Sequence, residues 1–261
     1  MQLMTRILLP LALAVAFAGP ATAQALFLDD FEYPAGDLLT DHGWTLIRSG
    51  TDIVVSSGGL SHSVYPHSGA GNAADLVRDG LQEVKRTFGV QTAGAVYAAF
   101  LVRPDTASET FNEGIFFYLG PTGTDIFNRF ATVYVNEDGN GMARFGVSKS
   151  SGIQFTGYDY PLGQTHLIVV KYEFLPGDPD PLSLWVNPDL ELPEPPAGDV
   201  STTNTTDALE LAEVVLSQIN GGPTATIDGI YIGTAWPRAL HVFSDGFESG
   251  DTSAWPDRIK G

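Results

Sequence analysis

The chain has 261 residues, with 13 lysine and arginine residues against 31 aspartate and glutamate residues, for a formal net charge of −18 at pH 7. This charge argues against nucleic acid and anionic membrane surfaces as partners, because both would be repelled, but it is compatible with divalent cations, neutral glycans or simple solubility. No cysteine is present, which excludes a disulfide framework, a thiolate metal site and a lipid-anchored N-terminal cysteine.

Residues 1–23 have the pattern of a cleavable secretory signal. A single positive charge, Arg6, precedes an apolar run over residues 7–17, and the small residues Ala21 and Ala23 follow. The run is short for a bilayer span, so we expect cleavage after Ala23 rather than an uncleaved anchor, with no membrane span afterwards. The sequence thus predicts an exported protein, located outside the cell, on its surface or in the periplasm.

The remaining sequence is expected to form one β-domain, residues 24–237, followed by a C-terminal tail, residues 238–261. The domain is long enough to bury a sizeable core. A short strand is expected to begin at residue 26, and an ordered loop should follow it as far as residue 44. Further strands are expected, in chain order, at residues 53–55, 84–90, 95–102, 115–119, 130–135, 143–147, 165–174, 183–188, 209–216 and 224–232. Residues 209–216 fit a helix or a strand, and their β-branched side chains favour a strand.

The strongest strand signal lies in residues 165–188. The sequences THLIVVKYEF and SLWVNP stand on either side of a loop with three prolines, which is typical of two adjacent antiparallel strands. Residues 61–72, rich in glycine, are expected to form a long surface connection, and residues 189–197 a proline-rich loop. So many strands, with hardly a convincing amphipathic helix, predict an all-β fold of two packed antiparallel sheets, a β-sandwich of the jelly-roll kind.

Several segments together resemble a known superfamily. The succession DDFEYPAGDLLTDHGW, SGAGNAADL, VVKYEF, SLWVNP and TIDGIYIGTAW is similar to the concanavalin A-like, or laminin G-like, jelly-roll domains of secreted bacterial proteins. This resemblance covers residues 26–236 and implies a sandwich of two curved sheets, often with carbohydrate-binding relatives. The tail, which contains DGFESGDTSAW, resembles short C-terminal segments of exported proteobacterial proteins and echoes the DDFEYPAGD sequence near the start of the domain.

The same resemblance implies a structural calcium ion near the first and last strands. Calcium requires several hard oxygen ligands, and we name Asp30, Glu32 and Asp228 as the candidates. Alternation within TIDGIYI would place Asp228 on the same face as Ile230 and Ile232, where a buried carboxylate needs a partner. The alternative is a hydrogen-bonded aspartate at a strand edge, or one paired with a basic residue such as Arg86.

The sequence offers no recognisable catalytic motif. A retaining glycosidase of this fold would carry alternating acidic residues on one strand, and no Glu-x-Asp-x-Glu pattern exists. Glu191 and Glu194 lie in the proline-rich loop, and the five histidines have no helical zinc spacing. His62 and His67 could bind a metal weakly, although loop histidines are more often only solvated. We therefore expect no catalytic residues.

Carbohydrate binding needs aromatic platforms rather than a motif. The aromatic residues that we consider are Trp44, Tyr65, Tyr158, Tyr160, Trp185 and Trp236. Trp185 is expected in the core because of its strand context. We name Trp44, Tyr158 and Tyr160 as ligand-binding candidates, since the two tyrosines alternate onto one face near a loop. The alternative is that these tyrosines are ordinary sheet pairs.

These observations predict a secreted, non-catalytic β-sandwich module that binds a polysaccharide, a cell-surface glycan or another surface partner. The first alternative is an extracellular polysaccharide hydrolase or lyase. The second is a structural or adhesion component that is displayed through its C-terminal tail.

Overall fold

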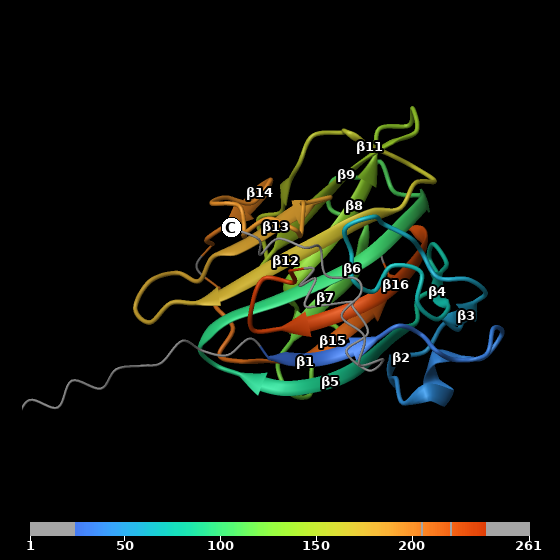
Figure 1. Ribbon diagram of the computed structural model, residues 1–261, viewed down its shortest axis with the longest axis horizontal. Helices are drawn as coiled ribbons and strands as arrows, with labels where there is room; N and C mark the ends of the chain where they lie inside the picture. Colours follow the sequence, from blue (N-terminus) through green and yellow to red (C-terminus); the bar gives the residue numbers. More distant parts are fainter. Residues whose placement is uncertain (1–23, 205, 220, 239–261) are drawn as a thin grey trace, which may run out of the picture.

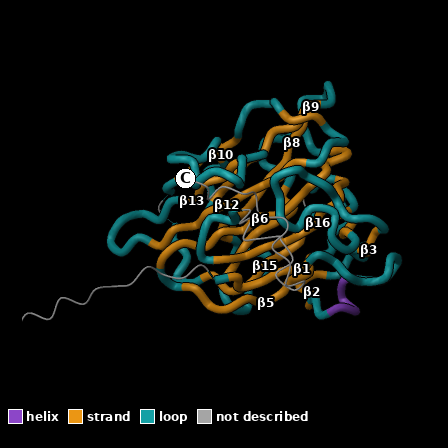
Figure 2. Tube along the Cα trace, in the orientation of Figure 1, coloured by secondary structure: helices purple, strands orange, loops and turns teal. Residues whose placement is uncertain are grey.

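The structure is a computed structural model and describes residues 24–204, 206–219 and 221–238. The expected signal sequence and the tail from residue 239 onward lie outside these residues. Within them the fold is all-β, and the single helical element is a short 3-10 helix, η1 (Leu39–His42), drawn in purple in Figure 2. No helix in this part of the chain is long and apolar enough to cross a membrane.

Two antiparallel sheets pack face to face as a β-sandwich of the jelly-roll kind (Figure 1). Sheet A has the strand order β14-β13-β12-β6-β16-β4-β3, and β1 also pairs with β16. Its strands are β1 (Ala25–Asp29), β3 (Val54–Ser56), β4 (Ala73–Leu76), β6 (Gly94–Thr106), β12 (His166–Phe174), β13 (Leu182–Val186), β14 (Val200–Thr202) and β16 (Thr224–Gly233).

Sheet B has the strand order β10-β9-β8-β7-β15-β5-β2, and β11 also pairs with β9. Its strands are β2 (Thr45–Arg48), β5 (Glu83–Gln91), β7 (Ile115–Gly120), β8 (Phe130–Glu137), β9 (Met142–Ser148), β10 (Gln154–Phe155), β11 (Tyr160–Pro161) and β15 (Leu211–Ser217). The sequence-based expectation of a two-sheet sandwich is therefore confirmed.

The apolar runs of the central strands are explained by burial on both faces. In β6 the side chains of Val96, Ala98, Phe100 and Val102 point into the core between the sheets. The alternate residues, such as Leu101, belong to a second apolar cluster on the outer face of sheet A. A strand covered on both sides loses the apolar-polar alternation of a half-exposed strand, which is why this stretch is nearly continuous in apolar residues.

Most of the expected strands are present. The predicted hairpin of residues 165–188 is confirmed as β12 and β13, which pair with Lys171 opposite Ser183. The ambiguous segment 209–216 is strand β15, paired between β5 and β7. The sequence reading missed β2 and β4 and the short strands β10, β11 and β14. These are the elements with too few residues to develop a clear period.

A long loop covers the outer face of sheet A. The segment expected as a surface connection, residues 61–72, lies against this face, and both Leu60 and Tyr65 are buried. The Tyr65 hydroxyl is directed at the backbone carbonyl oxygens of Ala99 on β6 and Gly229 on β16. Because the single hydroxyl proton lies within reach of both buried acceptors, the hydrogen bond fixes the loop to the sheet, where it can form one wall of a site.

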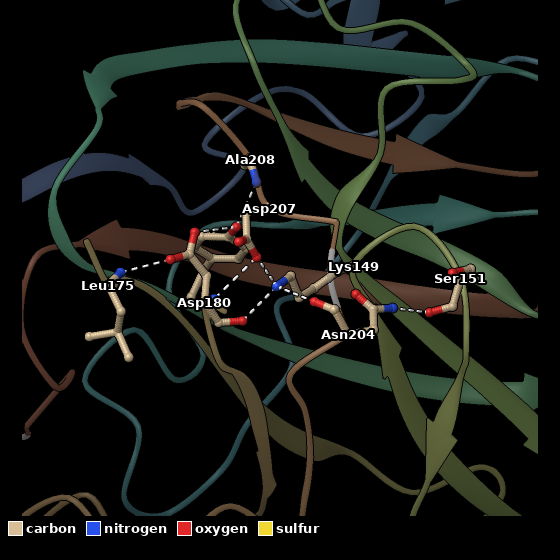
Figure 3. Close-up of polar contacts among 8 residues, drawn as sticks. Lys149, Ser151, Leu175, Asp180, Asn204, Asp207 and Ala208 are labelled. Atoms are coloured by element: carbon tan, nitrogen blue, oxygen red, sulfur yellow. Dashed lines mark hydrogen bonds and ion pairs between the residues drawn. The ribbon is translucent and has the colours of Figure 1, made fainter. Parts of the chain in front are cut away.

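A buried lysine joins sheet B to two loops at one side of the sandwich (Figure 3). Lys149, just after β9, is fully buried and donates to the carbonyl oxygens of Asp180 and Asn204, both at 2.7 Å. Its ammonium group also forms an ion pair with the Asp207 carboxylate. The Asp180 carboxylate in turn accepts a hydrogen bond of 2.8 Å from the Tyr172 hydroxyl. All the donors of the lysine are therefore matched by oxygen atoms.

Candidate functional site: an aromatic pocket over sheet A

A bulge in β16 creates the site. The register between β16 and β6 shifts between Asp228 and Tyr231. Gly229 has φ +58, and a Cβ there would lie 3.0 Å from the Tyr65 ring and 3.2 Å from the Cβ of His67. Glycine is therefore required both by the backbone and by the close approach of the loop.

The expectation that Asp228 lies on the same face of the strand as Ile230 and Ile232 is wrong, because of the bulge. Ile227, rather than Asp228, shares the core face with Ile230 and Ile232. Asp228 is fully buried, as expected, but it accepts a hydrogen bond from the backbone N–H of Leu60 in the covering loop. The extra residue at the bulge changes which β16 side chains point into the core on the two sides of Gly229. A strict alternation of inward and outward side chains does not predict this change.

A pocket of about 360 Å³ lies where the covering loop meets the end of β16. This aromatic pocket, as we name it, is lined by Tyr65, Pro66, His67, Tyr231, Ala235, Trp236, Pro237 and Arg238. Its volume falls in the range of roughly 300 to 1,000 Å³ that is usual for small-molecule sites.

Aromatic rings form half of the wall. The rings of His67 and Tyr231 are nearly parallel, with centroids 6.1 Å apart and an interplanar angle of 16°. Trp236 stands edge-on to Trp185, at 5.1 Å, and to Tyr97, at 6.2 Å. The buried indole N–H of Trp236 has no hydrogen-bond partner among the described residues. Packing against rigid neighbours fixes the orientation of Trp236 and leaves the wall preorganised.

The polar groups of the pocket are few and carry no negative charge. No aspartate or glutamate is found among its lining residues. Behind the wall, the Asp30 carboxylate lies 3.3 Å from Nδ1 of His67. Arg238 is exposed at the rim and donates a hydrogen bond of 3.4 Å to the backbone carbonyl oxygen of Glu191.

The carboxyl group of Asp228 supports the pocket from below. Its oxygens accept backbone N–H groups of Leu60, at 2.6 Å, and Gly229, at 2.7 Å. Burial raises the pKa of Asp228 to about 7, and the nearby charges of Asp30 and Asp29 act in the same direction, against the opposing effect of the two hydrogen bonds. Burial also raises the pKa of Tyr65 well above its usual value, so its hydroxyl stays a proton donor.

Two of the three predicted calcium ligands line the same hollow. Asp30 and Glu32 line one shallow hollow together with Asp29, Leu28 and Tyr33. Asp228 is not among the residues that line this hollow. No group of three or more His, Asp or Glu side chains within residues 24–204, 206–219 and 221–238 is arranged to hold a metal ion. Calcium binding stays a prediction.

The three predicted ligand-binding aromatics do not meet in one site. Trp44 is only 2% exposed and belongs to the core, which corrects the expectation that its ring is available to a ligand. Tyr158 lies over the Arg144 guanidinium at 4.5 Å, whereas Tyr160 packs against Phe145. Arg144 and Phe145 are successive residues of β9 and point to opposite faces, so the two tyrosines form no common platform.

Sequence reasoning considered only Tyr65 and Trp236 among the residues of the aromatic pocket. It passed over Tyr231 and Arg238, and it treated His67 as a loop histidine. The glycine inside TIDGIYI was the available signal, since a glycine within a strand marks a bulge or a close approach of other atoms. The contact of β16 with a loop about 160 residues earlier in the chain is set by tertiary packing.

The outer face of sheet B carries a second polar cluster. Glu83 on β5 is fully buried, and its Oε1 accepts hydrogen bonds from Ser217, at 3.0 Å, and Tyr118, at 3.3 Å. Its Oε2 has no hydrogen-bond partner among the described residues. Burial raises the pKa of Glu83, although the Ser217 hydrogen bond and the Arg129 charge oppose this shift. The acid is therefore protonated more readily than an exposed glutamate.

Comparisons with known proteins support the fold class. No protein-family model matches the sequence, and the search of curated proteins gave no match. Among solved structures, the globular domain of T. cruzi calreticulin is similar, with a TM-score of 0.50 and 11% identity over 81% of this chain and 88% of that chain.

Two other solved structures are also similar. A glycosyl hydrolase family protein from Mycobacterium fortuitum has a TM-score of 0.44 and 13% identity, over 80% of this chain and 99% of that one. A protein of unknown function from Shewanella oneidensis MR-1 has a TM-score of 0.43 and 16% identity, over 82% and 87% of the two chains. At these identities the likeness concerns the fold alone.

Proposed function

We propose that this protein is an exported, non-catalytic β-sandwich module that binds a saccharide in the aromatic pocket. The observation that carries the proposal is a mainly apolar pocket in which aromatic rings and prolines form most of the wall, with polar groups only at a few positions. The signal pattern of residues 1–23 supports export. A glycan of a cell surface or of an extracellular polysaccharide is the corresponding partner.

The physical match to a saccharide rests on the amphipathic character of a sugar ring. Its C–H groups carry partial positive charge and pack against the negative faces of aromatic rings such as Tyr231 and Trp236. Its hydroxyl groups need hydrogen-bond partners at the edges. The polar side chains of the lining that can supply them are the His67 imidazole and, at the rim, the Arg238 guanidinium.

The groups at the pocket wall support binding rather than hydrolysis. Glycoside hydrolysis requires two carboxyl groups flanking the scissile bond, and the lining residues contain none. The Asp30 carboxylate lies behind His67, where it orients the imidazole. Asp228 is fully buried and engaged by two backbone N–H groups.

A hydrolase or lyase is the second candidate, favoured by the cluster around Glu83. A buried carboxyl group with a raised pKa beside a tyrosine and an arginine is the kind of group that serves as a general acid or base. Glu83, Tyr118 and Ser217 are all fully buried, however, so a substrate would reach them only after the covering side chains move. This is why binding at the aromatic pocket is preferred.

The experiment is a pull-down of the mature chain on insoluble polysaccharides, followed by calorimetric titration with oligosaccharides of the retained type and a reducing-sugar assay. We expect retention without sugar release. Trp236→Ala and Tyr231→Ala should each weaken binding at least about tenfold, because each removes roughly 1.5 kcal/mol of ring packing.

Tyr158→Ala is the matched control, since Tyr158 lies over Arg144 of sheet B. It should bind like the parent protein. Release of reducing sugar that is lost in Glu83→Gln would instead support the enzyme. No retention on any polysaccharide would favour the structural or adhesion role.

A further inference from the structure

The lining of the aromatic pocket contains one permanently charged side chain, the guanidinium of Arg238, and no carboxylate, although the chain as a whole has a net charge of −18. Two other hollows of the described chain differ in this respect. One is lined by Asp29, Asp30 and Glu32, and the other includes Asp180. A ligand group that enters the aromatic pocket therefore meets a cation, with no acidic side chain in the wall beside it.

The position of Arg238 suits a ligand that lies on the rings. Arg238 follows Trp236 and Pro237 directly, and a hydrogen bond of 2.7 Å from its backbone N–H to the Trp236 carbonyl oxygen holds this turn tight. Among residues 24–204, 206–219 and 221–238, its guanidinium donates one long hydrogen bond, to a backbone carbonyl oxygen, and a guanidinium has five N–H donors. A guanidinium binds a carboxylate through two parallel hydrogen bonds, and such bonds are stronger than those between neutral groups.

On this basis we infer that the saccharide of the aromatic pocket carries a carboxylate, as a uronic acid does, which Arg238 binds while the sugar ring packs against Trp236 and Tyr231. This inference rests on the proposed function of the pocket. It adds the chemical class of the ligand.

The charge of the whole protein restricts this class further. Attraction by Arg238 acts over a few ångströms, whereas the surrounding negative charge repels any other anion that comes within a Debye length of about 8 Å at physiological salt. A glycan with a single uronate is attracted by Arg238, and it carries no further carboxylate that the negative charge of the protein would repel. A polyuronate brings several carboxylates to an acidic surface, so it is the poorer ligand.

The test compares matched oligosaccharides by calorimetry on the mature chain. The probes are xylo-, gluco- and galacto-oligosaccharides, each in neutral form, with one glucuronate residue, and with that glucuronate methyl-esterified, together with an oligogalacturonide. We expect the best free acid to bind about tenfold or more tightly than its ester, because hydrogen bonds to charged groups are typically worth roughly 1.5 to 3 kcal/mol. The oligogalacturonide should bind more weakly than that acid.

Arg238→Gln should remove the difference in affinity between acid and ester, because the acid loses its charged partner. Arg103→Gln is the matched control, because it removes the same charge from an exposed ion pair with Asp105 on β6. It should behave like the parent protein.

Each of the other outcomes contradicts the uronate inference, the preference for a single uronate, or the proposed function as well. Equal binding of acid and ester, lost in Trp236→Ala, overturns the uronate inference and leaves the saccharide pocket standing. Tighter binding of the oligogalacturonide contradicts the preference for a single uronate. If no probe binds, or if binding survives in both Trp236→Ala and Tyr231→Ala, the uronate inference and the proposed function fail together.

Discussion

The indole N–H of Trp44 donates a hydrogen bond of 3.0 Å to the buried carboxylate of Asp29. The same carboxylate accepts the backbone N–H of Phe31 and the hydroxyl of Tyr33, both at 3.0 Å. The Trp44 ring is also stacked near Phe31, at 6.3 Å between centroids. These contacts explain why the sequence from Asp29 to Trp44 forms an ordered unit, and why Trp44 lies inside the sandwich.

Asp29→Ala should lower the free energy of unfolding by about 3 kcal/mol, because it leaves three donors without their acceptor at roughly 1 kcal/mol each. Urea unfolding monitored by tryptophan fluorescence measures the change. Asp178→Ala, in an exposed loop, should change stability by less than about 0.5 kcal/mol. Similar stability of the two variants would show that the Asp29 hydrogen bonds do not stabilise the fold.

Lys149→Met should destabilise the protein by about 3 kcal/mol. The substitution removes the buried ammonium and leaves the carbonyl oxygens of Asp180 and Asn204 without their donor. Arg103→Gln, which breaks an exposed ion pair with Asp105 and a hydrogen bond to the Thr226 hydroxyl, should cost about 1 kcal/mol. A Lys149→Met protein as stable as Arg103→Gln would mean that the lysine cluster of Figure 3 does not hold the two loops.

Asp228 should make the protein less stable as the pH rises. Its pKa is about 7 in the folded protein against an ordinary value of 3.8, so the folded state binds more protons than the unfolded state between these values. Stability is therefore fully present below about pH 4 and falls as the pH rises through 7. Each unit of pKa difference corresponds to roughly 1.4 kcal/mol, so the whole effect is on the order of a few kcal/mol.

Asp228→Asn isolates this effect. In chelator-containing buffer, its cost in unfolding free energy should be smaller at pH 8 than at pH 5, because only the parent protein ionises a buried acid in between. Asp138→Asn is the control. The pKa of Asp138 is lowered by the backbone N–H groups of Asn140 and Met142, so it is ionised throughout this range and its cost should not change. A constant cost for Asp228→Asn would contradict the raised pKa.

Chelation tests the predicted calcium ion. Calcium at Asp30, Glu32 or Asp228 predicts that the Tm of calcium-loaded protein falls when excess chelator is added, since a ligand that binds only the folded state stabilises it. Asp30→Asn, which removes a ligand charge, should reduce that fall. An unchanged Tm in the parent protein would remove the calcium prediction.

The sandwich could be predicted from the sequence because each central strand is marked by its own run of apolar residues. The run from Val96 to Val102 is apolar at every position, and only a strand buried on both sides requires that pattern. The hairpin of residues 165–188 was predictable for the same reason. Short edge elements such as β14, with three residues, contain too few positions for a period to appear.

The site was less predictable because its residues are joined by tertiary contacts. Trp44 follows a glycine at the end of a loop, and nothing next to it indicates that Asp29, fifteen residues earlier, holds its indole N–H in the core. Asp228 was expected to face the core because a strict alternation of inward and outward side chains does not allow for the extra residue at Gly229. Tyr231 and Tyr65 meet only because the loop folds back across sheet A.

The most direct measurement of the central claim is the NMR signal of the Trp236 indole N–H in ¹⁵N-labelled mature protein during titration with an oligosaccharide that the chain retains. The account predicts a saturable shift of this signal with the affinity found by calorimetry, while the buried indole of Trp44 stays unchanged. Saturable binding of the oligosaccharide that leaves the Trp236 signal in place would contradict the account.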